Sequence, residues 1–538
     1  MKRSLVLTTA LVTGILLSGC SNNSSTSKTT TKKTLNLMES DTVATLDQSA
    51  STTVPLWDVL NQMNDGLFRS DKNNNPVPAL AKKTVVSKDG KRYTFYLKNA
   101  KWSNGDTVTA QDFVTAWRRG VAPTSLSGYS YIYNGIKNAS AIQNGKKKPS
   151  SLGVKAVSQN KLVVDLDYPI PTFTKKLTMT SFLPQNTKLV KKYGKKYGSS
   201  IKSYASDGAF KLSKWTPSSN TWTMVKNPNY YNRKEIKLSK IKYQVVKEAN
   251  TAHQLFQQGT LDDAVISGTT AQGLQNDKNL RQVDRSGNYF IRTNQAKGRV
   301  LNNAKLRQAL YLVINREQLA KKVMANGSKP SYTYSSPGAA KYPGTNKDFA
   351  TVAKPKETYN VAKAKKLWNE GLREIGKSNV TLTLVGYDTS TDKNQAEFIQ
   401  SQIVSKLSNV KVDVKSLPFN SAYNLAVKGD FDLQLSYWLN DYADPMSELE
   451  TQELTNSHNF GKYTSKNFNY QLSQARSKNA TTKKAYFKNL LNAQNQLTKD
   501  NPVIPLCTEV EDHLVNPKLK GVLWNTTGTA DYTRAYFN

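Results

Sequence analysis

The sequence predicts an α/β fold, in which strands and helices alternate along a chain of 538 residues. Short runs of alternating, aromatic or β-branched residues such as Arg92–Leu97 are typical of strands. Runs such as Pro55–Phe68 repeat apolar residues at helical spacing instead. A hydrophobic content of 38% with 21% charged residues allows a packed core. The length suggests about three or four domains.

Residues 1–19 are predicted to form a lipoprotein signal peptide. Lys2 and Arg3 precede an apolar run, Leu5–Leu17, which is shorter than the roughly 20 residues that a membrane-spanning helix needs. The small residues Leu17-Ser18-Gly19 then lead to Cys20, a pattern that resembles a bacterial lipobox, in which the cysteine is lipidated. The alternative is a plain secretory signal in which Cys20 is incidental.

Residues 21–34 contain only Ser, Thr, Asn and Lys. Because they have no apolar side chain to bury, they are predicted to form a flexible tether. A tether behind a lipidated cysteine predicts a globular body held on the extracytoplasmic face of the cell membrane.

The body is predicted to open with a strand at Leu35–Met38, followed by the helix Pro55–Phe68, which stops near Gly66. A later helix begins at Thr109, a plausible N-cap, with Asp112 near the positive end of the helix dipole. Further strands are predicted at Lys161–Leu166, Thr221–Lys226, Ile241–Val246, Val380–Gly386 and Val410–Val414. Further helices are predicted at Ala252–Gln258, Asn303–Ile314, Arg316–Ala325, Asn360–Ile375, Gln395–Leu407, Ser421–Val427 and Lys483–Lys499.

The chain is strongly basic, with 76 Lys and Arg against 39 Asp and Glu and a formal net charge of +37. The basic residues are spread along the chain, and no nucleic-acid-binding motif accompanies them. We therefore expect no nucleic-acid partner. An anionic cell wall and anionic lipid are the polyanions that suit an exported protein.

Few residues could support metal or nucleophilic chemistry. The two cysteines, Cys20 and Cys507, exclude a disulfide framework and a four-cysteine zinc site. Cys507 lies in an apolar segment and is expected to be a core residue. The spacing of the three histidines suggests no metal site, and neither a metal nor a cofactor is expected.

Gly371–Ser378 matches the phosphate-binding pattern G-x-x-x-x-G-K-S, which requires a strand before it and a helix after it. Here the predicted order is reversed, so Gly376 is interpreted as a helix C-cap.

A series of short segments runs in a fixed order through residues 35–520. Examples are Asn64–Phe68 (NDGLF), Lys101–Gly105 (KWSNG), Asn227–Tyr231 (NPNYY) and Trp438–Pro445 (WLNDYADP). Others are Pro78–Ala81, Thr109–Phe113, Gly208–Leu212, Arg307–Leu310, Ile314–Arg316 and Val503–Leu506. Each is weak alone, but the ordered set resembles the extracytoplasmic oligopeptide-binding lipoproteins of ABC importers, the peptide-binding type of solute-binding protein family 5.

The resemblance implies a two-lobed clamp, like periplasmic binding proteins, with an additional domain inserted in the first lobe. Residues 35–65, 203–298 and 508–538 are expected to form the first lobe, residues 66–202 the extra domain and residues 299–507 the second lobe. Two crossovers between the lobes would form a hinge. The resemblance also implies a monomer that delivers oligopeptides to an ABC transporter permease, which recognises the closed form.

A receptor for many peptides must read what all peptides share, the backbone amides and the terminal ammonium. A buried ammonium needs a carboxylate partner. In the family this is the Asp of an Asp-Tyr-x-acid-Pro segment, which Asp441 matches; the alternative is a turn acid before Pro445. Val54 matches the segment whose backbone pairs with the peptide.

Tyr129, Phe419 and Trp438 match aromatic positions that line the cleft in the family. Phe419 and Trp438 could instead be core residues, and Tyr129 has tyrosine neighbours that could take its place. Some relatives place peptide-binding arginines where this chain has Ala426 and Leu435, which suggests longer peptides with an unclamped C-terminus. Glu509 replaces a tyrosine of some relatives and, if it faces the cleft, favours basic ligands.

Other classes remain open from the sequence alone. The same fold could serve a signal-peptide (pheromone) receptor or a haem carrier, although haem requires an axial ligand and histidines are few. The charge would also suit a surface adhesin for anionic polymers. A hydrolase would cleave its ligand, but no catalytic motif supports one, and we expect no enzyme.

Overall fold

The computed structural model describes residues 32–51, 53–125, 128–477 and 482–538. The predicted signal peptide, Cys20 and most of the predicted tether lie outside these residues. The chain from Lys33 onward forms one unit. Its first strand, β1 (Thr34–Glu39), begins at the last residue assigned to the tether.

A four-stranded sheet contains β1, and its strand order is β1-β10-β9-β8. β1 alternates buried Leu35 and Leu37 with more exposed neighbours and runs parallel to β10 (Lys240–Val245). β8 (Phe210–Lys214) and β9 (Thr221–Lys226) complete the sheet in antiparallel pairs. Helix α1 (Val54–Met63) packs its buried face into the same apolar cluster as this sheet.

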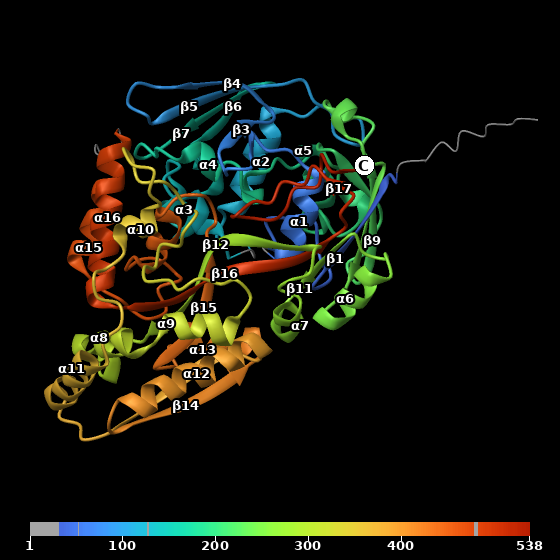
Figure 1. The fold of residues 1–538 in the computed structure, drawn as a ribbon. Helices are drawn as coiled ribbons and strands as arrows, with labels where there is room; N and C mark the ends of the chain where they lie inside the picture. The colour runs from blue at the N-terminus through green and yellow to red at the C-terminus, as the bar shows by residue number, and fades with distance from the viewer. Residues whose placement is uncertain (1–31, 52, 126–127, 478–481) are drawn as a thin grey trace, which may run out of the picture. The chain divides into compact units, whose positions relative to one another are not determined.

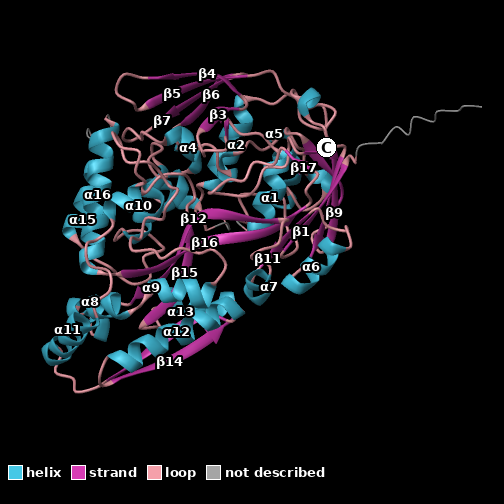
Figure 2. Ribbon diagram, in the orientation of Figure 1, coloured by secondary structure: helices cyan, strands magenta, loops and turns pink. Residues whose placement is uncertain are grey.

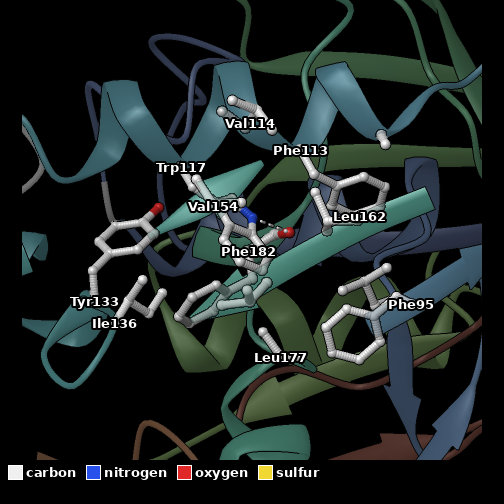
Figure 3. Packing of buried hydrophobic residues seen from close by; sticks show 14 of the residues in the cluster. Phe95, Phe113, Val114, Trp117, Tyr133, Ile136, Val154, Leu162, Leu177 and Phe182 are labelled. Atoms are coloured by element: carbon white, nitrogen blue, oxygen red, sulfur yellow. Dashed lines mark hydrogen bonds between the residues drawn. The ribbon is translucent and has the colours of Figure 1, made fainter. Parts of the chain in front are cut away.

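A second four-stranded sheet, of order β4-β5-β7-β6, lies within the predicted extra domain. Its strands are β4 (Ala81–Val86), β5 (Arg92–Leu97), β6 (Val154–Ser158) and β7 (Lys161–Asp165), and the short pair β2 (Phe68–Ser70) and β3 (Pro76–Pro78) precedes them. The helices in the same range of residues are α2 (Ala110–Gly120), α3 (Ala139–Gln143), α4 (Phe173–Lys176) and α5 (Thr187–Tyr193). Trp117 of α2 is fully buried beside Phe182, whose carbonyl accepts its indole N–H at 3.0 Å (Figure 3).

The largest sheet has six strands in the order β11-β16-β12-β15-β13-β14. These are β11 (Asp263–Ile266), β12 (Leu280–Thr293), β13 (Val380–Tyr387), β14 (Val410–Leu417), β15 (Leu433–Leu439) and β16 (Val503–Val515). Helices α12 (Ser390–Lys406) and α13 (Phe419–Lys428) lie against β13 and β14 (Figure 2).

The remaining helices and strands include several short elements and two packed helix pairs. They are α6 (Ala249–Gln257), α7 (Gly268–Gly273), α8 (Ala304–Val313), α9 (Arg316–Gln318), α10 (Phe349–Ala353), α11 (Val361–Glu374), α14 (Met446–Leu449), α15 (Lys466–Ala475), α16 (Lys483–Asp500), β17 (Leu519–Lys520) and β18 (Tyr536–Phe537). α8 packs on α11, and α15 packs on α16.

β12 and β16 are long neighbouring strands that run side by side (Figure 1). One half of β12 pairs with the half of β16 that also pairs with β11, and the other half of β12 pairs with β15. The register between them shifts between Asp284 and Asn288, and the Ser286 N–H donates to the Thr526 carbonyl instead. The two strands therefore join two groups of elements through an irregular stretch, as a hinge requires. The domain limits given above stay predictions.

Most of the strands and helices predicted from the sequence are present, with ends shifted by a few residues. Two differ in kind. The helix predicted over Pro55–Phe68 ends at Met63, because Asn64 is extended and Phe68 already belongs to β2. The helix predicted over Arg316–Ala325 continues after α9 as a π-helix, Leu319–Met324.

Two readings of local sequence are confirmed. Helix α11 precedes the G-x-x-x-x-G-K-S match and β13 follows it, with Gly376 at φ 66°, which is a C-cap and not a phosphate loop. Cys507 is a buried core residue, and burial raises the pKa of its thiol to about 12. Within the described part of the chain, no helix has the length and apolar character needed to span a bilayer.

Candidate ligand-binding site

A cavity of about 470 Å³, here called the main cavity, lies where parts distant in sequence meet. Its walls come from α1, from the segment Thr178–Thr180, from the end of β15, from β16 and from the segment after Trp524. All of the predicted ligand-contacting residues line it: Val54, Tyr129, Phe419, Trp438, Asp441 and Glu509. Their roles toward a ligand stay predictions, but the fold brings them to one site.

Asp441 follows the end of β15 and is held from both sides. The Tyr131 hydroxyl donates to its carboxylate at 2.8 Å, and its own N–H donates to Ser447 at 2.9 Å. Burial raises the pKa of Asp441 to about 7, although the tyrosine donors favour the charged form. Within the described residues Asp441 makes no ion pair, although the buried Lys176 lies near enough to favour its charged form.

His458 lies against two aromatic residues beside this site, Tyr131 and Trp438, and no role was predicted for it. Its ring packs edge-on against Tyr131 and Trp438, each at 5.1 Å between ring centroids. Burial, followed by the nearby Arg292, lowers the pKa of His458 to about 4. The imidazole is therefore neutral at neutral pH and supplies no charge to neutralise Asp441.

Aromatic side chains cover much of the remaining wall. Trp57 of α1 packs edge-on against Tyr129 at 5.5 Å, and Tyr129 packs against Tyr131 at 5.4 Å. Phe419 is 60% exposed, and its ring lies tilted against that of Tyr387 at 5.2 Å between centroids. The alternative that Phe419 is a core residue is therefore wrong, and Trp438 also lines the cavity.

Val54 begins helix α1 and is 53% exposed. The first N–H groups of a helix have no partner within the helix. The pairing of the Val54 backbone with an extended ligand stays a prediction.

Glu509 lines the main cavity, which is the position from which it was predicted to favour basic ligands. It accepts a hydrogen bond from the Tyr437 hydroxyl. Burial raises the pKa of Glu509 to about 7, although Arg285 nearby opposes the rise. Arg285 is itself paired with Glu511 at 3.0 Å.

Ala426 and Leu435 are buried in apolar clusters, so neither lies at the cavity wall. The arginines lining the cavity are Arg69 and Arg285. Arg69 is paired with Asp65 at 2.7 Å and with Asp531 at 2.9 Å. Among the residues that the structure describes, no arginine of the wall is thus left to meet a peptide C-terminus, and no histidine lines the cavity.

Several lining residues were missed from the sequence, among them Trp57, Arg285 and the segment Asn525–Asp531. A single sequence carries little signal for them, because they reach the cavity only through long-range strand pairing and through the packing of the C-terminal segment. Trp57 could have been found, since it directly follows Leu56, the first residue of the apolar face of the predicted helix.

Comparison with known proteins identifies the class. The family described as "Bacterial extracellular solute-binding proteins, family 5 Middle" matches residues 75–459. The chain is 34% identical to the dipeptide-binding protein of Lactococcus lactis, over 98% of each chain, and 30% identical to the oligopeptide-binding protein OppA of Bacillus subtilis, over 100% and 99%. The solved structure of Listeria monocytogenes OppA bound to peptide superposes with a TM-score of 0.82 at 31% identity, covering 94% of this chain and 99% of that one. The chain therefore belongs to the family 5 solute-binding proteins and has their two-lobed α/β fold.

Proposed function

We propose that this protein is a lipid-anchored receptor that captures extracellular oligopeptides and delivers them to an ABC transporter permease. The observation that carries this proposal is Asp441, an acid that makes no ion pair among the described residues and lines a cavity with aromatic walls. A buried carboxyl of this kind is complementary to the α-ammonium that every free peptide has. Two related proteins are named as a dipeptide-binding and an oligopeptide-binding protein, which also supports a peptide ligand.

Each wall has a part in holding the peptide. Asp441 takes the α-ammonium, and Tyr131 and Tyr129 orient its carboxylate. The Val54 backbone pairs with the peptide backbone by strand addition, which is independent of side-chain identity. Trp438, Phe419 and Tyr129 give apolar surfaces against which varied side chains pack. Glu509 favours peptides with a basic group.

Closure and delivery follow from the hinge. A peptide that contacts both groups of elements joined by β12 and β16 stabilises the closed arrangement, because it binds that arrangement better. The closed form is the one that a permease reads. A lipid on Cys20 would keep the receptor beside that permease.

Mass spectrometry of the purified protein under native conditions tests the class. We expect a mixture of intact peptides to be released on denaturation. Cleaved products of added peptide would indicate a hydrolase, and an empty cavity that fails to bind any added peptide would contradict the proposal.

The anchor is tested separately, by growth with a labelled fatty acid. We expect label on the wild-type protein and none on Cys20→Ser, which should be released from the cells. Equal release of both proteins would point to the plain secretory signal instead.

A further inference from the structure

A second cavity, of about 260 Å³, adjoins the main cavity and is here called the acidic pocket. It is lined by β1, α1, β11, β16 and the segment Trp524–Tyr532. It shares with the main cavity the lining residues Val54, Arg285, Glu511, Asn525 and Thr529. A chain that lies along Val54 therefore passes the acidic pocket. Asp441 is not among the residues that line the acidic pocket.

Four carboxyl groups line the acidic pocket: Glu39, Asp58, Asp263 and Glu511. Two of them already have cations. Asp263 is paired with His513 at 2.7 Å and also accepts from the Tyr532 hydroxyl at 2.7 Å. Glu511 is paired with Arg285 at 3.0 Å.

Glu39 and Asp58 are left without a cation. In the described part of the chain, neither makes an ion pair, and the lining Lys247 is exposed. Asp58 is only 6% exposed; its Oδ1 accepts from Gln62 at 3.3 Å, and its carboxyl also interacts with Tyr243 and with the carboxyl of Glu39. Burial raises the pKa of Asp58 to about 6, and burial with the neighbouring Asp58 raises that of Glu39 well above its usual value.

Two acids buried side by side are costly to ionise together, and a cation from outside would offset that cost. The other lining residues suit an amphipathic cation. Leu37, Val246 and Val265 are apolar and could cover a methylene stem, as lysine and arginine stems require. The acidic pocket, at about 260 Å³, has several times the roughly 30 Å³ that one water occupies, so it has room for a long side chain. In the described residues no group of carboxyl, histidine and cysteine side chains has metal-binding geometry, which argues against a bare metal ion.

We propose that the acidic pocket binds the cationic side chain, lysine or arginine, of a peptide held in the main cavity, through Glu39 and Asp58. This inference rests on the proposed function, because the peptide backbone must first lie along Val54. It gives the receptor a preference for basic peptides at one sequence position, separate from any preference due to Glu509.

The test is calorimetry with alanine-based pentapeptides in which one lysine is moved through all positions, each compared with its glutamine counterpart. Glutamine has no charge, so the ratio of the two Kd values isolates the cation. For the wild-type protein we expect lysine to bind about tenfold tighter at one position. In the double variant Glu39→Gln, Asp58→Asn the ratio should fall to about one. The control Asp413→Asn, which removes a surface partner of Lys411 on β14, should keep the ratio of the wild type.

Two results would overturn the inference: equal Kd values for lysine and glutamine at every position in the wild-type protein, or an unchanged ratio in the double variant. Loss of the ratio in Glu509→Gln but not in the double variant would place the basic side chain in the main cavity, and would also overturn it. Failure of the proposed function is distinct, since then the all-alanine peptide does not bind either. Thermal unfolding of each variant establishes that it is folded before binding is compared.

Discussion

At the scale of single residues, the main cavity depends on how one carboxyl is surrounded. Asp441 accepts a hydrogen bond from the Tyr131 hydroxyl, and the ring of Tyr131 packs in turn against the neutral His458. Burial and hydrogen bonding act on it in opposite directions, and burial is the stronger, so its pKa rises to about 7. An incoming ammonium would reverse that balance by pairing with the carboxylate.

Removing the carboxyl should therefore remove most of the affinity for free peptides. We expect Asp441→Ala and Asp441→Asn to weaken binding about 30-fold or more, since deleting one partner of a buried charge pair costs roughly 2–5 kcal/mol. Calorimetry with a free-amine peptide measures this. N-acetylated peptide should bind the wild-type protein poorly. Equal Kd values for free and acetylated peptide would contradict the role of Asp441.

The pKa of Asp441 also predicts how affinity changes with pH. Below about pH 7 the empty site is protonated, so capture of an ammonium must release a proton, and affinity should rise up to about tenfold per pH unit as pH increases toward 7. Above about pH 8 the α-amino group of the peptide loses its own charge, and affinity should fall.

Titrations at several pH values between 5 and 9 measure this profile. Tyr129, Tyr131, Glu450 and Lys176 also influence Asp441 electrostatically. Asp441→Asn is therefore the control, and its residual binding should lack the rise below pH 7. The same rise in that variant would assign the titration to another group, such as Glu509.

At the scale of secondary structure, side-chain caps and strand irregularities position the walls. Helix α2 begins with a capping box, in which Thr109 and Asp112 each bond the backbone of the other. Asp112 also accepts from the Trp102 indole at 3.2 Å and from the Thr187 N–H at 2.8 Å. This one acid therefore ties α2 to α5 and to the loop before α2. In β12 and β16, the register shift between Asp284 and Asn288 leaves an irregular stretch between the two groups of elements that these strands join.

Thr109→Ala removes the cap of α2 and should lower the free energy of unfolding by about 1 kcal/mol. Thr109→Ser keeps a hydroxyl at the same position and should recover most of the loss. Urea unfolding followed by tryptophan fluorescence measures both variants. A loss in Thr109→Ser as large as that in Thr109→Ala would show that the methyl group, and not the cap, supports the helix.

At the scale of the whole molecule, the question is what the large positive charge does. The net charge of +37 belongs to the full chain, whereas the main cavity is lined by acids and aromatics together with paired arginines. The surface charge and the captured ligand are therefore governed by different electrostatics. Exposed charges are screened by salt, and enclosed pairs are screened much less.

Raising NaCl from 50 to 500 mM should change peptide affinity by less than about threefold, since the ammonium pair is enclosed. Binding to an anionic polymer or to anionic vesicles should fall steeply over the same range. Parallel titrations with a peptide and with polyanion-coated beads measure the two effects. Peptide affinity that falls as steeply as polyanion binding would favour the adhesin alternative.

The sequence alone was sufficient for the fold class, because the period of apolar residues and the cap residues are local signals. β5 and β9 have the predicted limits, and α11 begins directly after Asn360. The same chain did not reveal β12, β15 or β16, whose pairing joins residues hundreds of positions apart. Nor did it place the end of α1, where the chain turns at Asn64 because tertiary contacts override the helical spacing.

For the candidate site, too, some features could be predicted from the sequence and others appeared only in the tertiary structure. The resemblance to a known family was enough to name Val54, Tyr129, Phe419, Trp438 and Asp441 by their matching positions, and Glu509 as a departure from the family pattern. Only the tertiary structure decided that they line one cavity, that a neutral His458 packs against Tyr131 and Trp438, and that Glu39 and Asp58 line one pocket with Val54 and make no ion pair among the described residues. The reason is physical: burial, distance and the loss of water determine a carboxyl's partners and pKa, and these quantities exist only once the chain has folded.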